Sequence, residues 1–172
     1  LFSYYGAQDA DRMIILMGSA TEAAREAIDY LNANGEKVRM ISVHLYRPCS
    51  VKHRLASVPA TVNRIAVLDR TKEPGAEGEP LYLDVKSAYY DVENRPLIVG
   101  GRYGLGSRDT TPAQIISVFN NLALPQPKNH FTLGIVDDVT FTSLPQVEEM
   151  ALGGAGMFEA KFFGLGADGT VG

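Results

Sequence analysis

The segment MIILM at residues 13–17, followed directly by GS at residues 18–19, decides the fold class. Five consecutive apolar residues bounded by a turn signal are typical of a short strand that is buried on both faces. A helical pattern follows, with Thr21 as the expected N-cap and a stop signal at residues 34–35. This stretch therefore predicts one strand joined to one helix.

The same alternation recurs along the rest of the chain. Apolar and β-branched residues predict further strands at residues 38–45, 64–68 and 96–99. A short helix capped by Ser50 is expected to end at residue 56, and apolar residues at every fourth position predict another helix over residues 81–89. After the fourth strand, Thr111 is the expected N-cap of a helix with Pro112 at its first position.

Four strand–helix alternations predict an α/β fold, a doubly wound and mainly parallel sheet with helices on both faces. A strand at residues 131–136 is expected to add an edge, which makes the sheet five-stranded. We assign the α/β domain to residues 1–124 and an edge strand with a linker to residues 125–160. Residues 161–172 are interpreted as the first strand and glycine loop of a following domain, so the chain is expected to be an excised fragment.

Composition excludes several classes of protein. Hydrophobic residues make up 45% of the chain and charged residues 21%, which is typical of a soluble globular protein. The net charge of -4, with no cationic run, disfavours nucleic acid as a partner, and no apolar run is long enough to cross a membrane. The single Cys49 excludes an internal disulfide framework and an iron–sulfur cluster held by this chain alone.

Three loops follow predicted strands, at the edge where ligands or partner surfaces meet a parallel sheet. The loop at residues 18–21 lacks both the G-x-G-x-x-G spacing and a P-loop lysine, which favours a tight turn over an anion site. The other two loops are residues 69–75 and 100–107. Their charged and aromatic residues favour a structural or interface role over a ligand site. The candidate interface residues are Arg70, Lys72, Glu73, Arg102 and Tyr103.

A fourth loop, GLGADG at residues 164–169, does match G-x-G-x-x-G, but the chain ends before the helix that confirms such a motif. Taken alone, the match favours a chain tail over a diphosphate site. Three histidines, His44, His53 and His130, have no Cys or Glu at metal-ligand spacing. No nucleophile elbow is present either. The residues themselves therefore predict neither a metal site nor a catalytic residue in this chain.

Five long strings carry a resemblance to a known family: LYRPCS at 45–50, IAVLDRTKEPGAEGEPLYLDV at 65–85, GGRYGLGSRDTTPA at 100–113, KNHFTLGIVDDVTFTSLP at 128–145 and KFFGLGADGTVG at 161–172. They occur in order between residues 45 and 172. By these strings the sequence resembles the thiamine-diphosphate-dependent pyruvate:ferredoxin oxidoreductases. The resemblance implies that residues up to about 124 form the second domain of such an enzyme, which is similar to the carboxyl-terminal domain of transketolases.

The resemblance also implies a function for the whole enzyme. It would oxidatively decarboxylate pyruvate with coenzyme A to acetyl-CoA and CO2 while reducing ferredoxin or flavodoxin. Thiamine diphosphate, Mg2+ and [4Fe-4S] clusters would lie in other domains, so this segment would bind none of them alone and would be inactive when isolated. Its expected role is to hold the catalytic domains and a homodimer in register.

Site and location follow from the same resemblance. The terminal glycine loop looks like the start of a domain that takes part in binding coenzyme A, and its implied contact residues are Gly166, Ala167, Asp168 and Gly169. The implied partners are the other domains of the same polypeptide, a second subunit, and ferredoxin or flavodoxin. The expected location is the bacterial cytoplasm or an anaerobic organelle such as a hydrogenosome.

Two other hypotheses remain open at this point. One is a stand-alone module that binds a nucleotide or coenzyme A at a loop on the sheet edge. The other is the same core taken from a pyruvate:NADP oxidoreductase, in which a fused reductase passes the electrons on.

Overall fold

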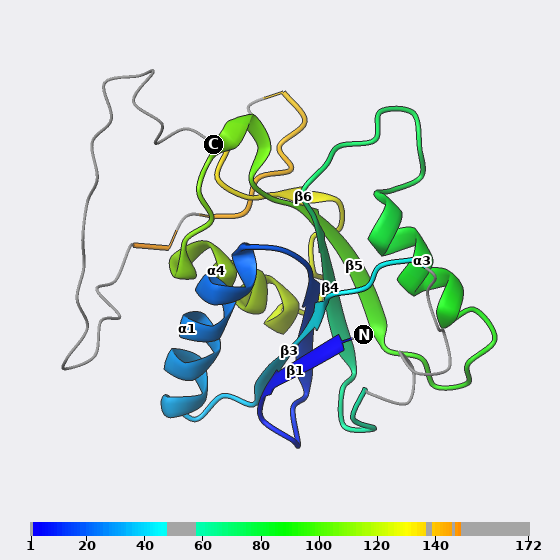
Figure 1. Cartoon of the computed structure of the whole chain (residues 1–172), viewed down its shortest axis with the longest axis vertical. Helices are drawn as coiled ribbons and strands as arrows, with labels where there is room; N and C mark the ends of the chain where they lie inside the picture. Colours follow the sequence, from blue (N-terminus) through cyan, green and yellow to red (C-terminus); the bar gives the residue numbers. More distant parts are fainter. Residues whose placement is uncertain (1, 48–57, 137–138, 146, 149–172) are drawn as a thin grey trace.

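The centre of the molecule is a single mixed sheet (Figure 1). The computed structural model describes residues 2–47, 58–136, 139–145 and 147–148. The sheet has six strands in the order β1-β3-β2-β4-β5-β6. The strands are β1 (Phe2–Gly6), β2 (Arg12–Leu16), β3 (Val38–Val43), β4 (Arg64–Asp69), β5 (Leu97–Arg102) and β6 (Phe131–Thr132).

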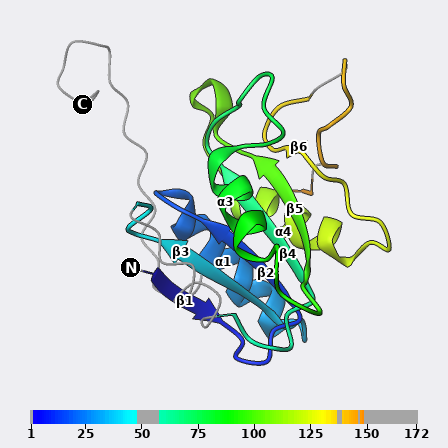
Figure 2. The same cartoon turned by 90° about the vertical axis from the view of Figure 1, so that its right-hand side faces the viewer.

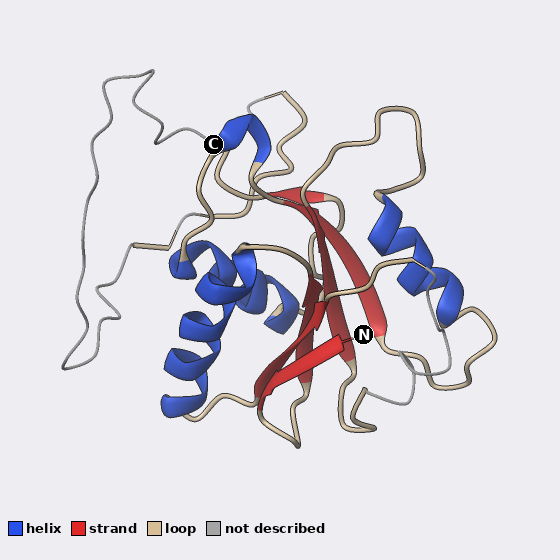
Figure 3. Cartoon of the chain, viewed as in Figure 1, coloured by secondary structure: helices blue, strands red, loops and turns tan. Residues whose placement is uncertain are grey.

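Three α-helices and one short 3-10 turn accompany the sheet in the described residues (Figure 3). They are α1 (Ala20–Ala33), α3 (Pro80–Ala88), η1 (Leu105–Ser107) and α4 (Pro112–Ala123). From β3 through β6 every neighbouring pair of strands is parallel, whereas β1 runs antiparallel to β3. The predicted doubly wound α/β class is confirmed, with six strands in place of the expected five.

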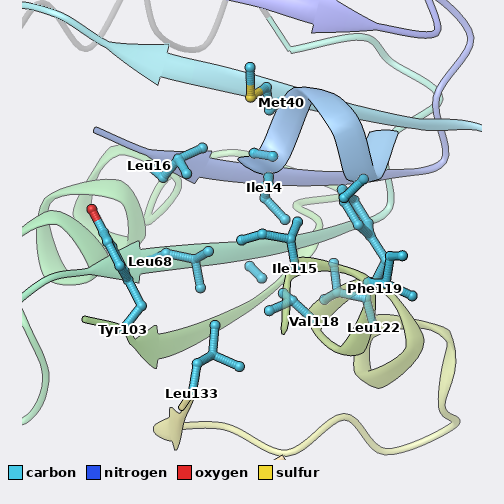
Figure 4. Packing of buried hydrophobic residues seen from close by; sticks show 14 of the residues in the cluster. Ile14, Leu16, Met40, Leu68, Tyr103, Ile115, Val118, Phe119, Leu122 and Leu133 are labelled. Atoms are coloured by element: carbon cyan, nitrogen blue, oxygen red, sulfur yellow. The ribbon is translucent and has the colours of Figure 1, made fainter. Parts of the chain in front are cut away.

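Helices cover both faces of the sheet because its central strands are apolar on both sides. In β2, Ile14 and Leu16 point into the cluster formed with α1 and α4, whereas Met13 and Ile15 join the cluster formed with α3. Figure 2 shows α3 in front of the sheet, with α1 and α4 behind it. Figure 4 shows the α4 side of this core, where Phe119 packs between the helix and the sheet.

The additional strand, β1, lies in a segment for which the sequence predicted no strand. Its residues FSYYG are mostly half-buried or exposed, and they pair with β3 from Phe2 opposite Val43 to Gly6 opposite Arg39. Gly6 has a φ of 111°, and a Cβ there would come within 2.9 Å of the Arg39 Cα. Glycine is therefore needed where β1 turns away from β3.

The predicted helix starts are correct in one case and wrong in another. Thr111 caps α4 as expected, since its side chain accepts a hydrogen bond from the Gln114 amide at 3.4 Å. Thr21 does not cap α1, which begins at Ala20, two residues earlier than expected, with Ser19 at the N-cap position. The Thr21 hydroxyl instead donates to the Gly18 carbonyl at 2.9 Å. The helix expected at residues 50–56 lies outside the described residues.

The segment after α4 completes the sheet and adds to the core. β6 pairs with the end of β5 but has two residues rather than the six predicted, because the chain turns at Gly134, where φ is 73°. Leu133 and Leu144 both pack into the cluster on the α4 side. The boundaries proposed at residues 124 and 160 stay predictions, and residues 161–172 lie outside the described part of the chain.

Candidate functional site

The strand order creates a crevice at the carboxyl ends of β2 and β4. The chain passes from β2 to β3 on one side and then returns to β4 on the other side of β2, so the two connections diverge at this point. Ligands of open α/β sheets bind at such switch points. A pocket of about 310 Å³ lies there, lined by Ser19, Ala20, Glu22, Ala23, Arg70, Tyr103, Arg108, Asp109 and Thr110.

The first wall of this pocket is the turn between β2 and α1. The Thr21 amide donates to the Gly18 carbonyl at 3.2 Å, beside the hydroxyl bond to the same oxygen. Gly18 has a φ of 79°, which favours glycine. The tight turn expected from the sequence is present.

Asp69, the last residue of β4, holds the start of α3 (Pro80–Ala88). Its two carboxylate oxygens accept hydrogen bonds from the amides of Leu81 at 3.0 Å and Tyr82 at 3.1 Å. Burial raises the pKa of this carboxyl, and the nearby charge of Glu79 adds to the effect, while the two amide donors oppose it. Asp69 therefore works as a helix cap supplied from a distant strand.

Glu79 is the residue that the sequence reasoning missed. It occupies the N-cap position of α3, is only 1% exposed, and forms an ion pair with Arg102 at the end of β5. Its second oxygen, Oε2, has no hydrogen-bond partner among the described residues. Pro80, in the first turn of α3, does signal a helix start. Nothing in the sequence, however, places Arg102 opposite Glu79.

Tyr103 ties the loop after β5 to the end of β2. The side chain is 3% exposed, and its hydroxyl donates to the Met17 carbonyl at 2.7 Å. Burial raises the pKa of the phenol. Figure 4 shows the Tyr103 ring among the core side chains near Leu16 and Leu68.

The remaining predicted interface residues follow β4. Arg70, Lys72 and Glu73 are all exposed. The Arg70 side chain lies across the neighbouring loop at Gly104, where a Cβ would come within 2.8 Å of the Arg70 Nε. Arg70 and Arg108 give the pocket two guanidinium groups suited to a carboxylate or phosphate, while Glu22 and Asp109 balance their charge.

The structure brings all five predicted interface residues to one edge of the sheet, where they fall into two groups. Arg102 and Tyr103 make contacts within the chain, whereas Arg70 and Lys72 face outward. Glu73 lies in the same outward loop, within 3.5 Å of the Thr71 hydroxyl. Their role in an interface stays a prediction, and Gly166, Ala167, Asp168 and Gly169 lie outside the described residues.

The described part of the chain contains neither a metal-binding cluster nor a helix that could span a membrane. No three His, Cys, Asp or Glu side chains come together there as a metal site requires. None of the helices in that part combines the length and apolarity needed to cross a bilayer.

A family model supplies the decisive comparison. Residues 10–115, more than half of the chain, match the model described as pyruvate:ferredoxin oxidoreductase core domain II. The chain belongs to the pyruvate:ferredoxin oxidoreductase family. The matched range runs from the start of β2 into α4, and so includes Asp69, Glu79, Arg102 and Tyr103.

Curated relatives within this family match the whole chain. A pyruvate-flavodoxin oxidoreductase of Enterobacter agglomerans is 60% identical over 173 residues, and a pyruvate:ferredoxin oxidoreductase of Moorella thermoacetica is 55% identical over 172 residues. In both cases the match covers 100% of this chain but 15% of the relative. The chain therefore spans about one seventh of the length of these relatives.

Among solved structures, the chain is similar to a 2-oxoglutarate:ferredoxin oxidoreductase from Magnetococcus marinus with 2-oxoglutarate, coenzyme A and succinyl-CoA bound. The TM-score is 0.49 at 22% sequence identity. The match covers 70% of this chain and 19% of the other.

Proposed function

We propose that this chain is a structural and interface domain of an enzyme that oxidatively decarboxylates pyruvate. The enzyme joins the acetyl group to coenzyme A, releases CO2, and passes the electrons to ferredoxin or flavodoxin. Support for this activity comes from the curated relatives, which are named as pyruvate-flavodoxin and pyruvate:ferredoxin oxidoreductases and match the chain from end to end. Thiamine diphosphate, Mg2+ and [4Fe-4S] clusters would belong to other parts of the enzyme.

One observation supports the structural role in particular. At the carboxyl edge of the sheet, where a doubly wound domain would bind a substrate, the buried polar side chains contact the domain's own backbone and side chains. Asp69 caps α3, Glu79 pairs with Arg102, and the Tyr103 hydroxyl binds the Met17 carbonyl. These contacts hold the loops after β2, β4 and β5 in fixed positions relative to one another.

The outward cations of the same edge would then meet a neighbouring domain or a second subunit. Arg70 and Lys72 are exposed, and neither forms an ion pair with a described residue. Arginine is enriched at the centres of protein interfaces, where its guanidinium group binds carboxylates through paired hydrogen bonds.

The test uses the parent enzyme and measures reduction of ferredoxin that depends on pyruvate and coenzyme A. Arg70→Glu combined with Lys72→Glu should weaken subunit or domain association, seen by analytical ultracentrifugation and a lower thermal midpoint. Lys37→Glu combined with Asp9→Lys, which exchanges the two charges of an exposed ion pair at the opposite end of the sheet, serves as the control.

The outcomes separate the two parts of the proposal. Absence of turnover with pyruvate, alongside turnover of another 2-oxoacid, would contradict the proposed activity. A loss of kcat by orders of magnitude in Arg102→Met, with the fold and assembly intact, would contradict the structural role.

A further inference from the structure

A second hollow lies at the other end of the sheet, where the chain leaves α3 and enters β5. It has a volume of about 600 Å³ and is lined by residues from the outer side of α3, the connecting loop and the start of β5. Figure 1 shows this α3–β5 connection away from the carboxyl ends of the strands. The groove is therefore separate from the pocket at the switch point.

Large apolar side chains line this groove and remain open to solvent. Tyr90 is 75% exposed, Leu97 47% and Leu83 37%. Single exposed apolar residues are common on protein surfaces, but three that gather around one concavity indicate a contact surface. Aromatic side chains at such places are frequent anchors of protein interfaces.

Two cations also line the groove, and neither is neutralised by the described residues. Lys86 places its ammonium over the Tyr82 ring, 5.2 Å from the ring centroid, and Arg95 donates to the Tyr90 carbonyl at 3.2 Å. Neither side chain forms an ion pair within the described part of the chain. The groove thus combines an apolar floor with a positively charged rim.

We propose that this groove binds a surface segment of another domain of the same enzyme, in which an apolar side chain is flanked by Asp or Glu. The apolar side chain would cover Tyr90, Leu83 and Leu97, and the carboxylates would pair with Lys86 and Arg95. The charge of the rim selects an acidic segment, since a basic one would meet repulsion from two cations. This inference rests on the proposed function only in taking the partner from the same enzyme.

Photo-cross-linking in the whole parent enzyme tests the proposal. p-Benzoylphenylalanine in place of Tyr90 should capture one peptide from outside these 172 residues, and mass spectrometry should find Asp or Glu beside an apolar residue in it. The same probe in place of Leu124, which is 51% exposed and outside the groove, is the control. The Leu124 probe should not capture that peptide.

Several results would overturn the inference. The Tyr90 probe could cross-link only to this chain's own residues, or only to a second copy of the domain. It could also capture a peptide without acidic residues, or give no cross-link in active enzyme. Turnover of pyruvate is measured on the same preparation. A cross-linked but pyruvate-inactive enzyme therefore contradicts the proposed function alone, whereas an active enzyme without the cross-link contradicts this inference alone.

A charge-reversal experiment tests the rim separately. Lys86→Glu with Arg95→Glu should lower the yield of the Tyr90 cross-link about fivefold, as expected for the loss of exposed ion pairs. Lys86→Arg with Arg95→Lys keeps both charges and should preserve the yield. Equal yields from the two double variants would overturn the acidic character of the partner.

Discussion

Glu79 and Arg102 form an ion pair that is almost closed to solvent and joins the N-cap of α3 to the last residue of β5. The Glu79 side chain is 1% exposed and that of Arg102 16%. Removing one partner of a buried pair is expensive because the other charge stays desolvated without compensation. The first prediction follows from this asymmetry.

Glu79→Gln should lower the free energy of unfolding by about 3 kcal/mol, because Arg102 then loses its carboxylate. Arg102→Met should destabilise the protein by a similar amount. The combination of Glu79→Gln with Arg102→Met should be less destabilising than the sum of the two single changes, since it leaves no unpaired charge. Urea denaturation of the four proteins measures this, and strict additivity would contradict the pairing.

Asp69→Ala should destabilise the start of α3 specifically. Two buried amides, those of Leu81 and Tyr82, lose their acceptor, at a cost of about 1 to 3 kcal/mol. Hydrogen exchange at these amides should accelerate more than exchange in α4. Asp84→Ala is the control, because that carboxylate forms a long ion pair, at 3.4 Å, with the largely exposed Arg47 side chain and should change stability little.

The raised pKa of Asp69 also predicts a dependence on pH. Between the ordinary carboxyl pKa of about 3.8 and the raised native value, the folded chain holds a proton that the unfolded chain has released. The contribution of Asp69 to stability therefore falls as pH rises through this window and then levels off. Denaturation across this range should show the advantage of the native protein over Asp69→Asn shrinking with pH. An advantage that grows with pH would contradict the sign.

Gly101→Ala tests the close contact between β5 and the segment that follows α4. A Cβ at this position would overlap the ring of Phe131, which is fully buried. We expect a destabilisation of about 1 to 3 kcal/mol from overpacking. In a Phe131→Leu background the same change should be much milder, because the smaller side chain leaves room. Thermal denaturation of the four proteins measures the coupling.

The sequence was sufficient to predict the parallel part of the sheet, because the signals for these strands lie within the strands themselves. The strands β2 and β4 are continuous apolar runs that no exposed element would carry, and Thr111 with Pro112 marks the start of α4 by itself. Such signals are contained within a few residues. The family resemblance rested on longer strings, and the family comparison confirms it.

The parts that sequence reasoning missed depend on partners distant in the chain. β1 becomes a strand only by pairing with β3, more than 30 residues later, and its own residues carry no clear alternation. Glu79 reads as one acidic residue among several in a loop, and Arg102 as part of a glycine-rich turn. Their pairing depends on how α3 packs against β5. This packing cannot be predicted from the residues around either side chain.

The antiparallel strand β1 also bears on how the domain can be shortened. It covers the open edge of β3, a strand whose residues are nearly all buried. A shorter version of the chain that starts after Gly6 would bare the amide and carbonyl groups of that apolar strand. Exposed apolar edges pair with other molecules, so such a truncation should make the protein prone to aggregate even though every helix is retained.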